Sequence, residues 1–321
     1  MFEQYLPKKF CREFVNIKDS DRQLIMFMAV VLGIKPAMDD WIPKKRLIRF
    51  INLCRKYGLK TKKDIAFSDI DNPNIKTATG GETLTTTIAK GVRISLANEL
   101  DMVHIFISKS KDNLDKAFVN GWYPVMIKNR VMQKPYIDLL KFGYGLGYPD
   151  CCIKFFRHFN DWRKYSHLFE IFKNTKGDPS FLCNPFTKDM VYSYIYHMPC
   201  SFNCTKTIDL TGKLREAIKS KEPELVKKID EHLKIPFLIF YETVMYAFRG
   251  EIRNNRLYYN QVYFVARFNK ENPYQKKLEK GNCLFVENRK VIILKNGKNI
   301  ATINCPKKDW ANKEPFLIQF K

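Results

Sequence analysis

The chain has 321 residues, 45% of them apolar, and a formal net charge of +23. This length and composition predict two or three folded domains and exclude a chain that is disordered throughout. The basic residues do not gather in one tail. We therefore expect the charge to reflect either an acidic partner, such as RNA or tRNA, or a lysine-rich proteome.

The sequence indicates a cytoplasmic protein that does not enter a membrane. Its first residues lack a basic segment followed by an apolar core, so no secretory signal is expected. The longest apolar stretch, residues 24–34, is well short of the roughly 20 residues that span a bilayer. In the cytoplasm, nine cysteines are expected to bind metal, take part in catalysis or lie buried, rather than form disulfides. The oligomeric state is left open.

In chain order, the sequence predicts an α+β protein with three parts. Residues 1–65 are expected to form a helical region, residues 66–235 a mixed α/β central domain with the cysteine motifs, and residues 236–321 a small, basic, antiparallel β domain. In the first part, apolar residues at helical spacing predict a helix that starts after Pro43 and ends at Gly58.

The central and last parts contain further predicted elements. Residues 102–107, 112–119 and 125–127 are predicted as a strand–helix–strand unit, in which His104 is packed. The strands predicted in the last part cover residues 237–241, 258–268, 282–286, 290–295 and 299–304. Asn296-Gly297 is typical of the tight turn of a hairpin between the last two strands.

The first cysteine motif follows a glycine-rich segment. Pro149 is expected at the first position of a helix, which places Cys151 and Cys152 in its first turn, where the helix dipole stabilises a thiolate. Neighbouring side chains of a helix point about 100° apart. We therefore expect the pair to fit a multi-iron cluster, or only one of the two to bind an ion. Asp150 and Tyr148 border this space as candidate catalytic acid–base groups, with helix capping and packing as the alternatives.

The second motif combines a histidine with two further cysteines. His197, Cys200 and Cys204 lie within eight residues, and Pro199 precedes the first cysteine. Ser201 is expected to cap a helix, which would place Cys200 and Cys204 about one turn apart on the same side.

Together the motifs predict one metal centre. The predicted ligands are Cys151, Cys152, Cys200, Cys204 and His197. Three or four thiolates suit an iron–sulfur cluster or Zn²⁺. The paired Cys-x2-Cys knuckles of a zinc ribbon and the Cys-x3-Cys-x2-Cys spacing of radical-SAM enzymes are both missing from this sequence. Cys183 is a spare ligand candidate, and a metal-free thiol site is the remaining alternative.

The two cysteine motifs together resemble those of a known family. Leu146-Gly147-Tyr148-Pro149-Asp150-Cys151-Cys152-Ile153-Lys154-Phe155-Phe156, followed by Asn184 and by His197-Met198-Pro199-Cys200-Ser201-Phe202-Asn203-Cys204, resembles an uncharacterised, largely archaeal family of unknown function. The resemblance covers residues 100–265. It implies that these residues form one site, and it names neither a reaction nor a ligand.

Two functions follow from these patterns. The first is a cysteine-ligated metalloprotein that acts as an enzyme on RNA or tRNA. The second is an RNA-binding protein whose metal is structural. For RNA binding, residues 251–321 carry 15 Lys or Arg against 6 Asp or Glu, a net charge of +9. The aromatic residues expected either to stack RNA bases or to fill the sheet core are Tyr258, Tyr259, Tyr263 and Phe268.

Overall fold

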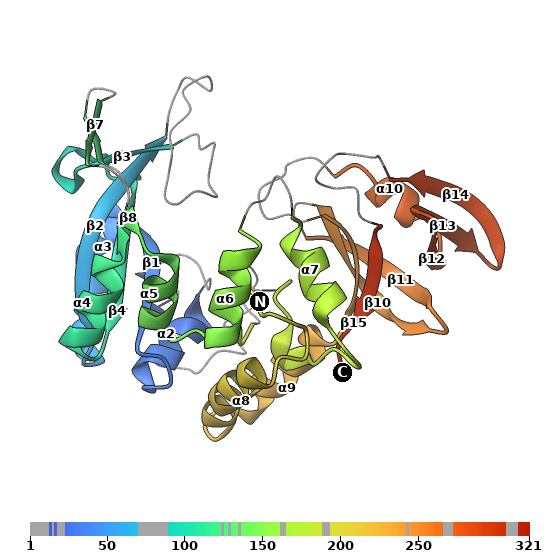
Figure 1. Cartoon of the computed structure of the whole chain (residues 1–321), viewed down its shortest axis with the longest axis horizontal. Helices are drawn as coiled ribbons and strands as arrows, with labels where there is room; N and C mark the ends of the chain where they lie inside the picture. Colours follow the sequence, from blue (N-terminus) through green and yellow to red (C-terminus); the bar gives the residue numbers. More distant parts are fainter. Residues whose placement is uncertain are drawn as a thin grey trace. The chain divides into compact units, whose positions relative to one another are not determined.

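The structure is a computed structural model (Figure 1). It describes residues 13–14, 16–17, 23–69, 89–122, 125–127, 130–133, 136–160, 165–187, 193–241, 244–265, 272–305 and 314–321. The chain divides into two compact units: unit 1 comprises residues 1–160 and 212–225, and unit 2 comprises residues 161–211 and 226–321. Helices and antiparallel sheets occur in both, which confirms the α+β class. The division at residues 65 and 235 stays a prediction. Among the described helices, none combines the length and the apolar character that crossing a bilayer requires.

Unit 1 is built on a four-stranded sheet. In spatial order its strands are β1 (Ala37–Pro43), β4 (Met102–Ser108), β2 (Lys60–Asp69) and β3 (Ala89–Val92). All neighbours are antiparallel. The helices of this unit include α2 (Leu24–Val31), α3 (Lys44–Lys56), α4 (Lys111–Val119) and α5 (Leu139–Gly145).

β1 and the start of β2 correct the expectation that residues 1–65 form a helical region. β1 carries Asp39 and Asp40, which strands disfavour, so its sequence gives a weak strand signal. Pairing with β4 along its whole length overrides that preference. The predicted helix after Pro43 is confirmed as α3, and Gly58 follows it in the left-handed conformation with φ 70°.

The predicted strand–helix–strand unit is only partly right. The first strand and the helix are confirmed as β4 and α4. The second strand, β6 (Val125–Ile127), pairs with β7 (Arg130–Gln133) in a separate two-stranded sheet, so it does not extend the sheet of β4. A further two-stranded sheet joins β5 (Gly121–Trp122) and β8 (Tyr136–Ile137).

The start of the first cysteine motif lies against this unit's core. Ala37, Phe106, Leu114, Ala117 and Leu146 form a buried cluster, and the ring of Tyr148 packs at its edge. α5 and α6 (Asp150–His158) approach closely, because a Cβ on Gly143 would lie 2.8 Å from the side chain of Ile153. This packing holds the first turn of α6 against α5.

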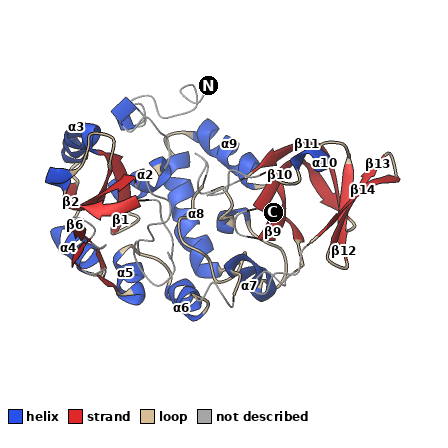
Figure 2. Cartoon of the chain, turned by 90° about the horizontal axis from the view of Figure 1, so that it is seen from above, coloured by secondary structure: helices blue, strands red, loops and turns tan. Residues whose placement is uncertain are grey.

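Unit 2 contains a seven-stranded antiparallel sheet, whose strands are drawn in red in Figure 2. Its spatial order is β14 (Lys298–Asn304), β13 (Lys290–Lys295), β12 (Cys283–Glu287), β11 (Arg256–Phe264), β10 (Val244–Arg253), β9 (Pro236–Tyr241) and β15 (Phe316–Gln319). The predicted hairpin turn is confirmed, with φ 51° at Asn296 and 82° at Gly297. β10 and β15 were not predicted, and the part of the predicted strand beyond Val265 lies outside the described residues.

The helices that follow or flank the motifs complete the described fold. They are α7 (His167–Asn174), the short 3₁₀ helix η2 (Phe181–Cys183), α8 (Thr205–Lys219), α9 (Pro223–Leu233) and the one-turn α10 (Gln275–Leu278). η1 (Ile94–Leu96) is a second 3₁₀ turn in unit 1.

Candidate metal centre

The first motif begins a helix, as predicted, with Pro149 one position earlier than expected. Pro149 has φ −61° and ψ 136°, which makes it the N-cap, and its carbonyl accepts the backbone N–H of both Cys152 and Ile153 at 3.0 Å. Asp150 is therefore the first helical residue, and Cys151 and Cys152 are the second and third. The predicted position of both cysteines in the first turn is confirmed. This is the N-terminal end of α6, where the helix dipole favours negative charge.

The two adjacent cysteines converge, and this corrects the expectation that they point apart. Their Sγ atoms lie 3.9 Å from each other. Bonds from Cα to Cβ tilt toward the helix N-terminus, and in the first turn no earlier turn obstructs the side chains. Two neighbouring side chains can therefore both reach one point beyond the N-terminus of the helix, although seen along the helix axis they leave the backbone in different directions.

The second motif forms a turn that leads into α8. The Cys204 N–H donates to the Ser201 carbonyl at 3.2 Å, and the Cys204 carbonyl accepts the Ile208 N–H at 2.9 Å. Cys204 therefore occupies the N-cap position that was predicted for Ser201. The prediction of a helix from Thr205 is confirmed. Cys200 lies four residues earlier, at the other end of this turn.

Neighbouring backbone and an aromatic cluster fix the turn. Phe202 is fully buried, and its ring lies 5.5 Å from the rings of Phe186 and Phe320. The Phe202 N–H donates to Thr175 Oγ1 at 2.9 Å, and Asn174 Nδ2 donates to the Cys200 carbonyl at 2.8 Å. The end of α7 thus holds both halves of the turn. The sequence gives no sign of this role, because nothing in the spacing of Asn174 and Thr175 relates them to the motif.

Four of the predicted ligands come together. The Sγ atoms of Cys151, Cys152, Cys200 and Cys204 all lie within 4.8 Å of one another. Cys152 and Cys204 are buried, whereas Cys151 and Cys200 are half-buried. A set of four close thiols offers the soft ligands that zinc and iron–sulfur centres use, so these cysteines could hold a metal ion. None of the eight described cysteines is part of a disulfide.

Neither His197 nor Cys183 belongs to the set of four cysteines that the described residues bring together. His197 is buried, and its Nε2 lies 3.0 Å from Thr207 Oγ1 on the first turns of α8. Its role as a ligand stays a prediction. Cys183 is fully buried, and its thiol donates to the Cys204 carbonyl at 3.7 Å. Burial, reinforced by the neighbouring thiols of Cys204 and Cys200, raises the pKa of Cys183.

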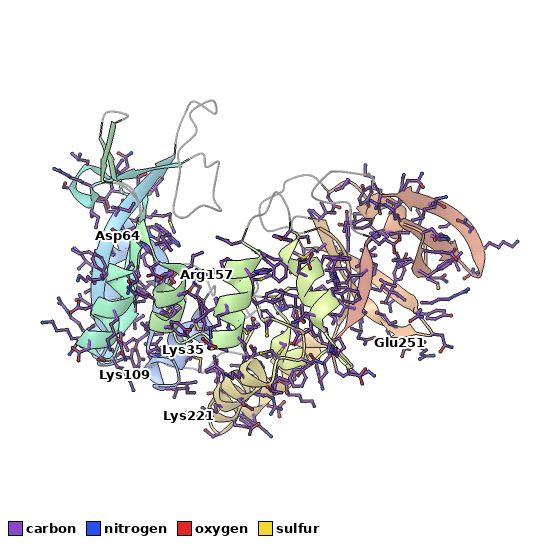
Figure 3. All side chains as sticks on the ribbon, in the orientation of Figure 1. Lys35, Asp64, Lys109, Arg157, Lys221 and Glu251 are labelled. Atoms are coloured by element: carbon purple, nitrogen blue, oxygen red, sulfur yellow. The ribbon has the colours of Figure 1, made fainter. Side chains whose placement is uncertain are left out.

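The two candidate acid–base residues have local partners. The Tyr144 hydroxyl donates to Asp150 Oδ1, and Lys154 Nζ lies 3.0 Å from Asp150 Oδ2. The Tyr148 ring lies 4.3 Å below the Nζ of Lys35, a buried lysine that is labelled in Figure 3. These contacts are of the kind that capping and packing provide, and the catalytic roles of Asp150 and Tyr148 stay predictions.

The comparisons with known proteins give one result. No protein-family model, curated protein or solved structure matches this chain.

Proposed function

We propose that this protein is a metalloprotein of the cytoplasm whose metal is held by Cys151, Cys152, Cys200 and Cys204. The observation that carries the proposal is the mutual approach of the four sulfur atoms to within 4.8 Å. A tetrahedral zinc ion with Zn–S bonds of about 2.3 Å holds its sulfur atoms roughly 3.8 Å apart. The 3.9 Å between the two sulfur atoms of the first motif matches such an edge.

This spacing favours a single ion, and zinc in particular, over an iron–sulfur cluster. The cysteines of a four-iron cluster each bind a different iron, so their sulfur atoms stand farther apart than around one ion. The geometric objection to one ion, that adjacent cysteines diverge in a helix, no longer holds for this pair. An iron–sulfur centre is the alternative, and it would supply redox chemistry to the residues around it.

A centre closed by four protein ligands has the character of a structural site. Catalytic zinc ions keep a position for water or substrate, whereas four thiolates fill the coordination sphere. The donor set therefore favours an RNA-binding protein with a structural metal over an enzyme that acts on RNA or tRNA. An RNA partner is supported by the net charge of +9 over residues 251–321.

Cobalt substitution tests the proposed centre. Metal-free protein is titrated with Co²⁺ under anaerobic conditions and its absorption spectrum recorded. We expect the strong ligand-field bands of tetrahedral thiolate-bound Co²⁺, saturating at one ion per chain and displaced by Zn²⁺. If the protein is brown as purified and contains iron and sulfide, the centre is an iron–sulfur cluster instead of a zinc ion. A spectrum without thiolate–metal bands in either experiment would refute the centre.

A further inference from the structure

The sheet of unit 2 turns two tyrosines outward. Successive residues of a strand face opposite sides. Leu257, Tyr259 and Val262 of β11 are buried in the core, and a bulge after Tyr259 brings Val262 onto the same side as the other two. Tyr258 and Tyr263 point the other way, with 44% and 43% of their surface exposed. Of the aromatic residues considered for RNA stacking, Tyr259 is thus a core residue, and Phe268 lies outside the described residues.

Exposed arginines share this outer face. In the register of β10 and β11, Arg253 lies opposite Arg256, Glu251 opposite Tyr258, and Arg249 opposite Gln261. Residues opposite each other in a sheet project to the same side. All three arginines are exposed, whereas Glu251 is paired with Arg253.

The next strand continues the face with a third aromatic ring. Phe285 of β12 is half-buried, and the guanidinium carbon of Arg256 lies 5.1 Å from the centre of its ring. Beyond it, Ile292 pairs with Phe285, and Thr302 of β14 pairs with Ile292. The outer face is therefore a continuous strip of aromatic, aliphatic and cationic side chains across β10–β14.

A bulge next to the tyrosines bends this strip. The register of β10 and β11 shifts between Arg249 and Gly250. A Cβ on Gly250 would lie 2.0 Å from the Tyr258 carbonyl, so only glycine permits this approach. Bulges increase the local twist and re-aim side chains. The extra residue of the bulge places Tyr258 and Tyr263, five positions apart, on the same face. At about 3.3 Å per residue they lie roughly 16 Å apart along the strand.

We propose that this outer face binds single-stranded RNA, with Tyr258 and Tyr263 stacking on bases and the arginines contacting phosphates. The outer face is defined by Arg249, Arg253, Arg256, Tyr258, Tyr263 and Phe285. Stacking requires bases that are not paired, and the faces of bases in a duplex are inaccessible to side chains. The spacing of the two tyrosines leaves room for intervening nucleotides. The inference deepens the proposed RNA partner and does not depend on the metal.

Binding of a labelled oligonucleotide tests this surface. The full chain is titrated into fluorescein-labelled oligouridine, and into a hairpin duplex of equal length, and anisotropy gives the dissociation constants. We expect tighter binding to oligouridine. Each of Tyr258→Ala and Tyr263→Ala should weaken it about tenfold, the effect of losing one stacked base. Tyr258→Phe keeps the ring and should bind like the unchanged protein. Arg249→Gln should lower the salt dependence of binding.

A matched control and an independent readout separate the outcomes. Val119→Ala changes another exposed side chain, 55% accessible, on α4 of unit 1, and should leave RNA binding unchanged. A variant that carries both Tyr258→Ala and Tyr263→Ala is measured as well. The inference is overturned if the unchanged protein does not bind oligouridine at low salt, or if it binds the duplex with equal affinity. It is also overturned if the double variant binds oligouridine as tightly as the unchanged protein. Metal content is measured in the same samples. A metal-free protein that binds oligouridine through these tyrosines supports this surface while refuting the metal centre.

Discussion

Gly147 lies so close to Pro36 that a Cβ atom on Gly147 would stand 2.4 Å from Pro36 Cδ. Gly147 also has φ 74°, the left-handed conformation that side chains disfavour. It forms the turn between α5 and the helix of the first cysteine pair. We predict that Gly147→Ala destabilises the protein by about 2–4 kcal/mol, because backbone strain and overpacking add.

Gly58→Ala provides the matched control for this prediction. Gly58 has φ 70°, but among the described residues no heavy atom beyond Gly58 and its two chain neighbours lies within 4 Å of the position that its Cβ would take. Its substitution should cost only the backbone strain, about 1–2 kcal/mol. Urea unfolding of both variants measures the difference, and equal losses would show that the contact with Pro36 is unimportant.

His104 joins three strands through two carboxylates. It is fully buried in β4, its Nε2 lies 3.1 Å from Asp39 Oδ2 of β1, and its Nδ1 lies 3.3 Å from Asp64 Oδ2 of β2. Burial alone lowers the pKa of His104, but the hydrogen bonds and charges of both carboxylates outweigh it and raise the pKa above 6.5. The stabilisation is therefore complete below pH 6.5 and is lost as the pH rises through the folded-state pKa.

We predict that His104→Gln loses about 3–5 kcal/mol of unfolding free energy at mildly acidic pH, because Asp39 and Asp64 lose the buried positive charge that lies between them. The loss should shrink at alkaline pH, where the histidine of the unchanged protein is neutral. Denaturant unfolding of both proteins across this pH range measures the difference. A difference that stays constant with pH would contradict a charged histidine.

Lys35 should show the opposite dependence on pH. Burial lowers the pKa of Lys35 to about 7, although the charge of Asp39 opposes the shift. The folded state then binds fewer protons than the unfolded state between pH 7 and the ordinary value of 10.5, so this lysine makes stability rise with pH in that window. Lys35→Met should remove a slope of up to about 1.4 kcal/mol per pH unit. Denaturant unfolding from neutral to alkaline pH measures this slope, and an unchanged slope would contradict the lowered pKa.

Substitution of Asp150 tests whether this residue only supports the start of α6 or binds the metal. Its side chain is 39% exposed, and its carboxylate accepts a hydrogen bond from Tyr144 and forms an ion pair with Lys154. We predict that Asp150→Asn changes stability by less than about 1 kcal/mol, the usual worth of an exposed ion pair. Metal content, measured by elemental analysis, should be unchanged. Loss of the metal in this variant would place Asp150 in the centre itself.

The sequence predicted the first helix start and most strands of the terminal sheet, because Pro149 and the turn at Asn296 leave local signals. It could not predict the convergence of Cys151 and Cys152, which depends on rotamers in the first helical turn. It also could not place Tyr258 and Tyr263 on the same face, because five residues separate them and only the bulge between them restores the alternation. The support of Cys200 by Asn174 is a contact between segments 26 residues apart, and no local pattern encodes it.

Metal content of cysteine variants tests the central claim most directly. Protein purified anaerobically should contain one metal ion per chain if the ion is zinc, or iron with sulfide if it is a cluster. Cys151→Ser, Cys152→Ser, Cys200→Ser and Cys204→Ser should each lower the content or affinity strongly. Cys283→Ser, which changes a buried cysteine of β12, should leave both unchanged. Unchanged protein that holds no metal after anaerobic reconstitution, or full occupancy when all four cysteines are serine, would contradict the account.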